Sequence, residues 1–91
     1  MTYVVRYSKN IDWKKFRSIS ARDKQRIKRA IERKLMTDPF VFGKSLRKSL
    51  WGCRSLRVGD YRIIYRIEKK IVEILLFGHR STVYSDAGGI L

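Results

Sequence analysis

The sequence predicts an α+β domain, in which an antiparallel sheet of three to four strands packs against an N-terminal helical hairpin. Two observations support this prediction. Apolar residues recur at helical spacing in the first half of the chain and at every second position in the second half. Asp38-Pro39, with Gly43 soon after, separates the two halves, and the period changes to two from about Trp51. Because 91 residues suffice for one domain and are too few for two, we expect a single domain over residues 1–91.

The first half is expected to form a strand and then two helices. Residues 2–7 (TYVVRY) are β-branched and aromatic, which favours a strand. Asn10 and Asp12 offer a cap for a short helix, and Ser20 is the expected N-cap of the main helix. Since proline disfavours helix in the residue before it, the main helix should end near residues 36–38. Its narrow apolar stripe consists of Ile27, Ala30, Ile31 and Leu35.

The second half is expected to be an antiparallel meander. Residues 40–50 should connect the two halves, and strands follow near 52–58, 61–67 and 71–77. Short turns join them, and tightly connected strands pair antiparallel. In the second strand one face should carry Tyr61, Ile63, Tyr65 and Ile67, and the other Arg62, Ile64 and Arg66. The composition of residues 84–91 is typical of a flexible tail.

The charge of the chain restricts its function. Lysine and arginine number 22 against 8 acidic residues, which gives a net charge of +14. This excess is larger than solubility requires and favours a polyanionic partner: nucleic acid, an anionic membrane surface or an acidic protein. No stretch reaches the ~20 apolar residues of a membrane span, and the N-terminus lacks the pattern of a signal peptide. We therefore expect a cytoplasmic protein without a membrane partner.

The motifs of several enzyme classes are missing from the sequence. Cys53 is the single cysteine, so it cannot form an internal disulfide, and one thiol cannot build a zinc site. No glycine-rich loop precedes a helix as a nucleotide phosphate site would require. The acidic residues are scattered, which argues against a metal-dependent nuclease. We therefore expect neither a metal nor a cofactor.

The segment LRVGDYRIIYRI (residues 56–67), followed by an apolar strand and GHRSTVY (78–84), resembles the RelE/ParE toxin superfamily over nearly the whole chain. Both branches share the GDYRIIY core, and the ending is similar to that of the RelE branch. The resemblance implies a type II toxin that cleaves mRNA in the ribosomal A site without a metal, by attack of the 2′-hydroxyl on the adjacent phosphate. It also implies an acidic antitoxin, with operator DNA bound only through the toxin–antitoxin complex.

The resemblance also implies catalytic roles for individual residues. By position, Arg62 matches the strand arginine of the family, Arg80 its C-terminal arginine, and Tyr84 its tyrosine near the end of the chain. Metal-free RNA cleavage needs a base, an acid and cations around the phosphate, and arginine suits the last role. If the last segment returns beside the hairpin, one concave basic surface could hold His79, Arg80, Tyr84, Arg54, Arg57 and Arg62.

The sequence departs from the family pattern at one place. Two lysines that RelE-type enzymes often carry before the GDYR turn correspond here to Cys53 and Ser55. Arginine remains protonated and cannot easily replace a lysine as a base. His79 could supply the missing acid–base group. Further contacts to RNA phosphates are expected from Arg54, Arg57, Lys44, Arg47 and Lys48.

Three alternatives remain open at this point. The missing lysines are compatible with a ParE-like toxin that inhibits DNA gyrase without catalysis. A degenerate toxin that retains only antitoxin and operator binding is the second alternative. The third concerns single residues: Tyr84 could simply fill the core, and Arg62 and Arg66 could belong to an ordinary solvated sheet face.

Overall fold

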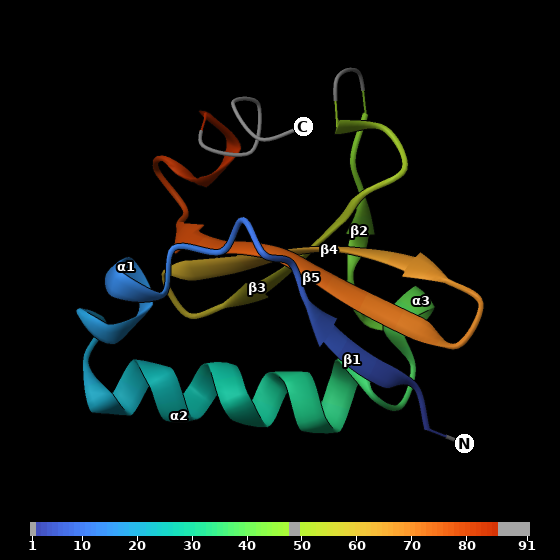
Figure 1. Cartoon of the computed structure of the whole chain (residues 1–91), viewed down its shortest axis with the longest axis horizontal. Coiled ribbons are helices and arrows are strands. Elements are labelled where there is room, and N and C mark those ends of the chain that lie inside the picture. The colour runs from blue at the N-terminus through green and yellow to red at the C-terminus, as the bar shows by residue number, and fades with distance from the viewer. Residues whose placement is uncertain (1, 48–49, 86–91) are drawn as a thin grey trace.

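A computed structural model describes residues 2–47 and 50–85 of the chain and shows one five-stranded sheet with its long helix on one face (Figure 1). The strand order is β1-β5-β4-β3-β2. The strands are β1 (Val4–Tyr7), β2 (Lys44–Ser45), β3 (Arg54–Val58), β4 (Tyr61–Glu68) and β5 (Ile71–His79). The predicted α+β class is confirmed, and β3, β4 and β5 form the expected antiparallel meander.

The number and direction of the strands correct the prediction in two respects. β1 pairs parallel with β5, from Val4 opposite Ile71 to Tyr7 opposite Ile74, so the sheet is mixed. Parallel pairing is possible because the helices carry the chain across the sheet before the meander begins. The expected connector over residues 40–50 contains a helical turn, α3 (Pro39–Phe42), and the short edge strand β2, which pairs with β3.

The caps that the sequence indicates define the helices α1 (Trp13–Arg17) and α2 (Ala21–Ala30). Asp12 Oδ1 accepts hydrogen bonds from the backbone N–H groups of Lys14 and Lys15, both at 3.1 Å. Ser20 Oγ accepts one from the N–H of Asp23 at 3.2 Å. α2 continues into a π-helical turn, η1 (Ile31–Leu35), so the helical segment ends where the proline rule predicts.

Replacing Ser20 by alanine is expected to lower the free energy of unfolding by about 1 kcal/mol, since the N–H of Asp23 then loses its acceptor. Urea denaturation measures this change. Ser20→Asp keeps a side-chain acceptor and should stay close to the unchanged protein. Equal losses in both variants would show that the cap is not the cause.

The core lies between α2 and the sheet. Ile27, Ile31 and Leu35 pack against the face of the sheet that carries Ile63 and Tyr65, and all five side chains are buried. The predicted alternation along β4 is confirmed, because Tyr61 and Ile67 pack against this same core while Ile64 belongs to a cluster on the opposite face. We call the face away from α2 the outer face.

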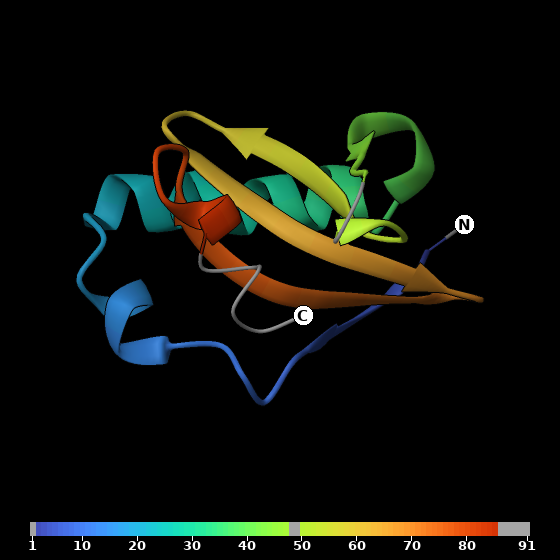
Figure 2. The same cartoon turned by 90° about the horizontal axis from the view of Figure 1, so that it is seen from above.

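The outer face carries a second, smaller apolar cluster that the sequence analysis did not predict. A register shift between Ile64 and Tyr65 leaves Leu75 without a partner residue on β4, so that Leu75 and Leu76 both join this cluster. Val83 covers it from the chain segment after β5, which lies above the sheet in Figures 1 and 2. The other members are Leu50, Cys53 and Ile64. The chain that follows the meander is therefore fixed to the outer face.

Candidate functional site

Two arginines occupy opposed positions on the β3–β4 hairpin. Arg57 on β3 is directly opposite Arg62 on β4, and opposed residues of an antiparallel pair project from the same face. Like charges in this position repel each other. Within residues 2–47 and 50–85, no acidic side chain forms an ion pair with either guanidinium. The Nε of Arg57 donates a hydrogen bond to the Gly59 carbonyl at 3.3 Å, and Arg57 also lines a pocket with Arg26 and Arg29 of α2. Arg62 is therefore the cation that this hairpin presents on the outer face without a described carboxylate partner.

Tyr84 joins this pair from the segment after β5. Its hydroxyl donates a hydrogen bond to Ser55 Oγ at 3.2 Å, and the guanidinium carbon of Arg62 lies 5.9 Å from the centre of its ring. Ser55 is only 3% exposed, whereas Tyr84 is 38% exposed. Tyr84 does not fill the core. It is held at a fixed place on the surface, and the neighbouring Val83 is the buried residue.

Lys44 is a further positively charged residue on this face. It lies on β2 opposite Ser55, so it shares the outer face with Ser55 and is a cross-strand neighbour of the residue that holds Tyr84. The site as we define it comprises Lys44, Ser55, Arg57, Arg62 and Tyr84. Ser55 corresponds to a missing family lysine in the sequence, and only the structure shows that it holds the tyrosine.

Gly78 makes the return of the last segment possible. A Cβ atom at this position would lie 2.8 Å from Val83 Cγ2 and 3.2 Å from Val83 Cα, closer than side chains normally pack. Since Gly78 is opposite Arg62 on β4, this close approach brings the segment over the arginine. The glycine of the GHRxxVY ending therefore has a packing function.

Gly78→Ala is expected to lower the free energy of unfolding by about 1–3 kcal/mol, the usual cost of overpacking. Much of the clash is with the Val83 side chain, so Val83→Ala should relieve part of it. The double variant should then lose less stability than the sum of the two single variants, as urea denaturation of the four proteins can show. Additivity within about 0.5 kcal/mol would mean that these residues do not clash.

The structure does not place Arg54 with the other site residues, which corrects the expected grouping. Arg54 is opposite Tyr65, so it projects to the helix side of the sheet. Its guanidinium donates to the carbonyls of Phe40 at 2.6 Å and Gly43 at 2.7 Å, and to Ser45 Oγ at 2.8 Å. These bonds fix α3 and β2 to β3, so the structure gives Arg54 a structural role.

His79 is also separated from the site. It is opposite Tyr61, on the helix side, and the two rings make an edge contact at 5.7 Å. Its Nδ1 lies 2.8 Å from Ser81 Oγ and accepts the N–H of Ser81 at 3.2 Å. Because His79 and Arg62 project from opposite faces of adjacent strands, the structure does not support His79 as the acid–base group of this site.

Three expected residues remain: Arg80, Arg47 and Lys48. Arg80 is tied to the β3–β4 turn: its N–H donates to the Asp60 carbonyl at 2.9 Å, and its Nε lies 3.8 Å from Asp60 Oδ1. Arg47 is exposed and comes in the sequence before the residues of the apolar cluster on the outer face. Lys48 lies outside the described residues. Among the described residues, no contact joins Arg80 or Arg47 to Arg62 or Tyr84.

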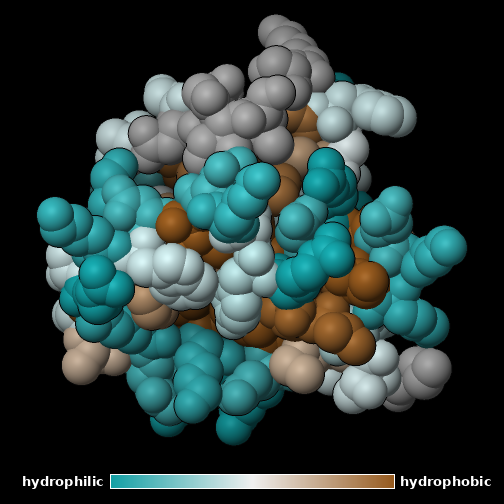
Figure 3. Space-filling model, in the orientation of Figure 1, coloured by the Kyte–Doolittle hydropathy of each residue, from teal (hydrophilic) through white to brown (hydrophobic). Residues whose placement is uncertain are grey.

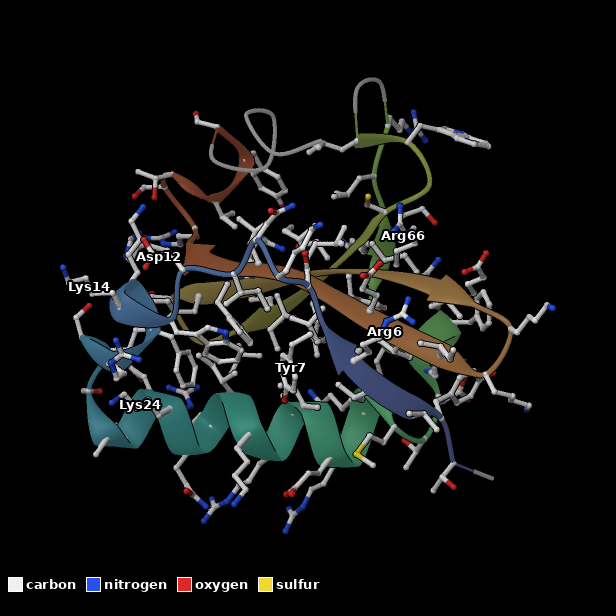
Figure 4. All side chains as sticks on the ribbon, in the orientation of Figure 1. Arg6, Tyr7, Asp12, Lys14, Lys24 and Arg66 are labelled. Atoms are coloured by element: carbon white, nitrogen blue, oxygen red, sulfur yellow. The ribbon has the colours of Figure 1, made fainter. Side chains whose placement is uncertain are left out.

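Two other features of the outer face bear on its chemistry. Arg66 shares this face but binds Glu73 at 2.6 Å, and Arg6 approaches the same carboxylate at 3.9 Å; Figure 4 shows both arginines. Burial raises the pKa of the Cys53 thiol, with nearby Arg66 opposing this shift, so Cys53 stays protonated at neutral pH and packs as an apolar residue. Among the described residues, no cluster of His, Cys, Asp and Glu side chains could hold a metal ion.

Comparison with known proteins identifies the family. The family model of the ParE toxin of type II toxin–antitoxin systems matches residues 3–84. The chain belongs to this family. The resemblance to the RelE/ParE toxin superfamily, which rested on the GDYRIIY core and the GHRSTVY ending, is thereby confirmed.

Similar protein sequences and similar solved structures both agree with this family assignment. Over 52 residues, 55% of this chain, it is 44% identical to Toxin RelG and 42% identical to Toxin RelE of Mycobacterium tuberculosis. These matches span 60% and 54% of the two relatives, so the chain corresponds to little more than half of their length. The fold is similar to that in the toxin–antitoxin complex RelBE2 of M. tuberculosis, with a TM-score of 0.79, 30% identity, and coverage of 88% of this chain and 100% of that one.

The part of this ParE-family chain that the structure describes includes no helix long and apolar enough to cross a membrane.

Proposed function

We propose that the protein is the toxin of a type II toxin–antitoxin system and acts as a metal-independent endoribonuclease on mRNA in the ribosomal A site. The observation that carries this proposal is the cluster on the outer face, where Tyr84 is held between Ser55 and Arg62 beside a second arginine. Acid–base and cationic groups are the two requirements of metal-free phosphodiester cleavage. The cytoplasm, where mRNA and ribosomes meet, is the expected place of action.

The reaction would divide between the arginines and the tyrosine. In the cleavage implied by the family, the 2′-hydroxyl attacks the adjacent phosphorus and the bond to the 5′-oxygen breaks, leaving a 2′,3′-cyclic phosphate and a 5′-hydroxyl. Arg62 and Arg57 would bind the phosphoryl oxygens, because a guanidinium donates two hydrogen bonds in a fixed fork. Tyr84 would donate a proton to the leaving 5′-oxygen, and Lys44, the cross-strand neighbour of Ser55, would accept the proton of the attacking 2′-hydroxyl.

The experiment that tests this proposal is induced expression in a bacterial host, followed by primer extension on several abundant transcripts. We expect growth arrest with cuts inside translated regions, and these cuts should disappear when translation is blocked. Cuts that persist without translation would contradict the ribosomal site. Growth without arrest or cuts would favour a degenerate toxin.

We also propose an acidic antitoxin as the partner of the toxin. The structurally similar RelBE2 protein was solved as a toxin–antitoxin complex, and a chain with a net charge of +14 is complementary to an acidic segment. Such a segment would be disordered alone and fold on binding. The affinity should fall at least tenfold between low and high salt, because screening weakens attraction between charged surfaces.

Gyrase inhibition is the second candidate function, since the matching family model is that of the ParE toxin and neither Cys53 nor Ser55 is a lysine. A DNA supercoiling assay with purified gyrase separates the two functions. Inhibition of supercoiling without RNA cleavage would replace our proposal with this one. Unimpaired supercoiling would eliminate it.

A further inference from the structure

Trp51 lies on the chain between β2 and β3 and is 82% exposed, more than any other large apolar side chain in the described part of the protein. Figure 1 shows this chain rising from the outer face of the sheet, on the same side as the segment after β5 that carries Tyr84. Exposed aromatic side chains near positive charge are typical of surfaces that bind single-stranded nucleic acid.

The backbone around Trp51 fixes its exposure. The Cys53 N–H donates to the Leu50 carbonyl at 3.0 Å, so residues 50–53 form a tight turn. Gly52, the third residue of this turn, has a φ of 92°, which glycine adopts readily. Leu50 and Cys53, the two ends of the turn, are buried in the apolar cluster on the outer face. Because both ends are anchored, Trp51 is held at the surface and cannot turn into the core.

A pocket of about 230 Å³ lies beside Trp51. Phe40 and Leu46 also line it, and the ring centre of Phe40 lies 5.8 Å from the guanidinium carbon of Arg54. One turn of an α-helix, about 10 Å wide and 5.4 Å long, occupies about 420 Å³. The pocket is therefore too small for a partner helix, and its size and aromatic lining suit a single planar ring.

The polar groups of the pocket favour a ligand with hydrogen-bond acceptors. Arg54 and Ser45 line the pocket, and none of the described lining residues is acidic. The terminal nitrogens of Arg54 already donate to Ser45 Oγ and to two backbone carbonyls. Its Nε is a buried donor for which residues 2–47 and 50–85 provide no acceptor. Carbonyl oxygens and ring nitrogens at the edges of nucleobases are acceptors of the required kind.

Trp51 is near the proposed cleavage site. Ser55, which binds the Tyr84 hydroxyl, is four residues further along the chain, so the Cα atoms of Trp51 and Ser55 are at most about 14 Å apart. Bases stacked along one strand are about 3.4 Å apart, so this distance corresponds to about four nucleotides. Lys44 and Arg47 are exposed on the chain that leads from β2 to Trp51 and can contact the phosphates between.

The charge of the surface also favours RNA as the ligand of Trp51. Figure 3 shows hydrophilic side chains over much of the visible face, in agreement with the net charge of +14. A polyanion with planar rings satisfies both the positive charge and the exposed indole. An acidic peptide would satisfy the charge alone.

We propose that Trp51 binds a base of the mRNA by stacking, with the base in the pocket beside it and within about four nucleotides of the cleaved bond. The mRNA strand would then contact the outer face at two places, Trp51 at one and Arg62 with Tyr84 at the other. Stacking tolerates any sequence, because every base has an aromatic face. The identity of the ligand as mRNA rests on the function proposed above.

Tryptophan fluorescence of the purified full chain tests this contact. The chain has two tryptophans, so a Trp13→Phe background leaves Trp51 as the single source of indole emission. The probe is a 12-nucleotide single-stranded RNA that is methylated at every 2′-oxygen and therefore cannot be cleaved by 2′-hydroxyl attack. We expect the probe to quench the emission, because a base stacked on an indole lowers its fluorescence. An abasic strand of the same length carries only the phosphates and should quench far less.

Variants of the two tryptophans separate stacking from charge. Fluorescence anisotropy of the labelled probe, at one salt concentration, measures the affinity. Trp51→Ala should weaken binding about tenfold, and Trp51→Tyr, which keeps an aromatic ring, should stay within about threefold. Trp13→Ala is the matched control, because Trp13 is also exposed but lies among residues of β1 and α2. This control should change the affinity less than about twofold.

Three results would overturn the proposal: no quenching of the Trp51 emission, equal quenching by the abasic strand, or equal losses of affinity in Trp51→Ala and Trp13→Ala. Urea denaturation of Trp51→Ala should match the unchanged protein, which separates a loss of binding from a loss of folding. RNA cleavage that is absent from every protein, with Trp51-dependent binding intact, would contradict the proposed ribonuclease and support the base contact.

Discussion

Replacing Arg62 with alanine is expected to slow mRNA cleavage by about 10²–10³-fold, the usual effect of removing one donor that stabilises transition-state charge. Arg62 faces Arg57 across the strand pair and lies over the ring of Tyr84. The variant should fold, because Arg62 is half-buried and contributes to neither apolar cluster. Single-turnover cleavage of mRNA on programmed ribosomes measures the rate.

Arg66→Ala is the matched control for this variant. Arg66 lies on the same strand and the same face as Arg62, but it pairs with Glu73 at 2.6 Å and has no contact with Tyr84 in the described structure. Its replacement should leave the cleavage rate within about threefold, since surface ion pairs contribute little. Equal losses in both variants would indicate that the positive charge of the face matters and that the position of Arg62 does not.

Two substitutions of Tyr84 distinguish a role in proton transfer from a role in base stacking. Tyr84→Phe keeps the ring near Arg62 and removes the hydroxyl that binds Ser55, so the maximal rate should fall about 10²-fold or more. Tyr84→Ala also removes the ring and should raise the substrate concentration needed for half-maximal rate, because stacking contributes about 1–3 kcal/mol per base. A Tyr84→Phe variant with full activity would refute the proton-transfer role.

The largest loss of stability is expected from Gly43→Ala. A Cβ atom at Gly43 would overlap the hydroxyl oxygen of Tyr65 and lie 2.8 Å from its Cζ. Tyr65 cannot move aside, because it is fully buried and its hydroxyl donates to the Pro39 carbonyl at 2.8 Å. We expect a loss of at least about 3 kcal/mol, the upper end for overpacked cores, and a fall in Tm of 12 °C or more on the basis of about 4 °C per kcal/mol.

Gly52→Ala controls for the general effect of adding a methyl group to a glycine. No atom lies within 4 Å of a Cβ at Gly52, although its positive φ of 92° disfavours alanine. Backbone strain alone should cost about 1–2 kcal/mol. Thermal unfolding of both variants decides the matter, and a Gly43→Ala protein as stable as Gly52→Ala would mean that Tyr65 rearranges at little cost.

Burial raises the pKa of Tyr65, and the guanidinium of Arg54 partly opposes this effect. The hydroxyl therefore remains protonated at neutral pH and keeps its hydrogen bond to Pro39. Arg54 is part of the same structure, since it binds the carbonyls on either side of α3. The Arg54 guanidinium therefore contributes to the structure around α3 and Tyr65.

Part of the candidate site could be predicted from the sequence. The family motif and the strand periodicity together predicted that Arg57 and Arg62 lie on one hairpin and that Tyr84 lies near the end of the chain. In the structure, Arg57 is opposite Arg62, and Arg62 contacts the ring of Tyr84. The role of Ser55 could not be predicted, because a serine in place of a lysine has no pattern of its own. Its function depends on a contact with a residue 29 positions later.

Local sequence patterns were enough to predict the helix caps at Asp12 and Ser20, the end of the helical segment before Pro39, and the meander with its alternating β4. These features depend on neighbours a few residues apart. The parallel pairing of β1 with β5, and the orientation of Arg54 and His79 away from Arg62, became known from the three-dimensional structure. The reason is that alternation places residues relative to their own strand, whereas pairing partners and the path of the last segment depend on packing between distant parts of the chain.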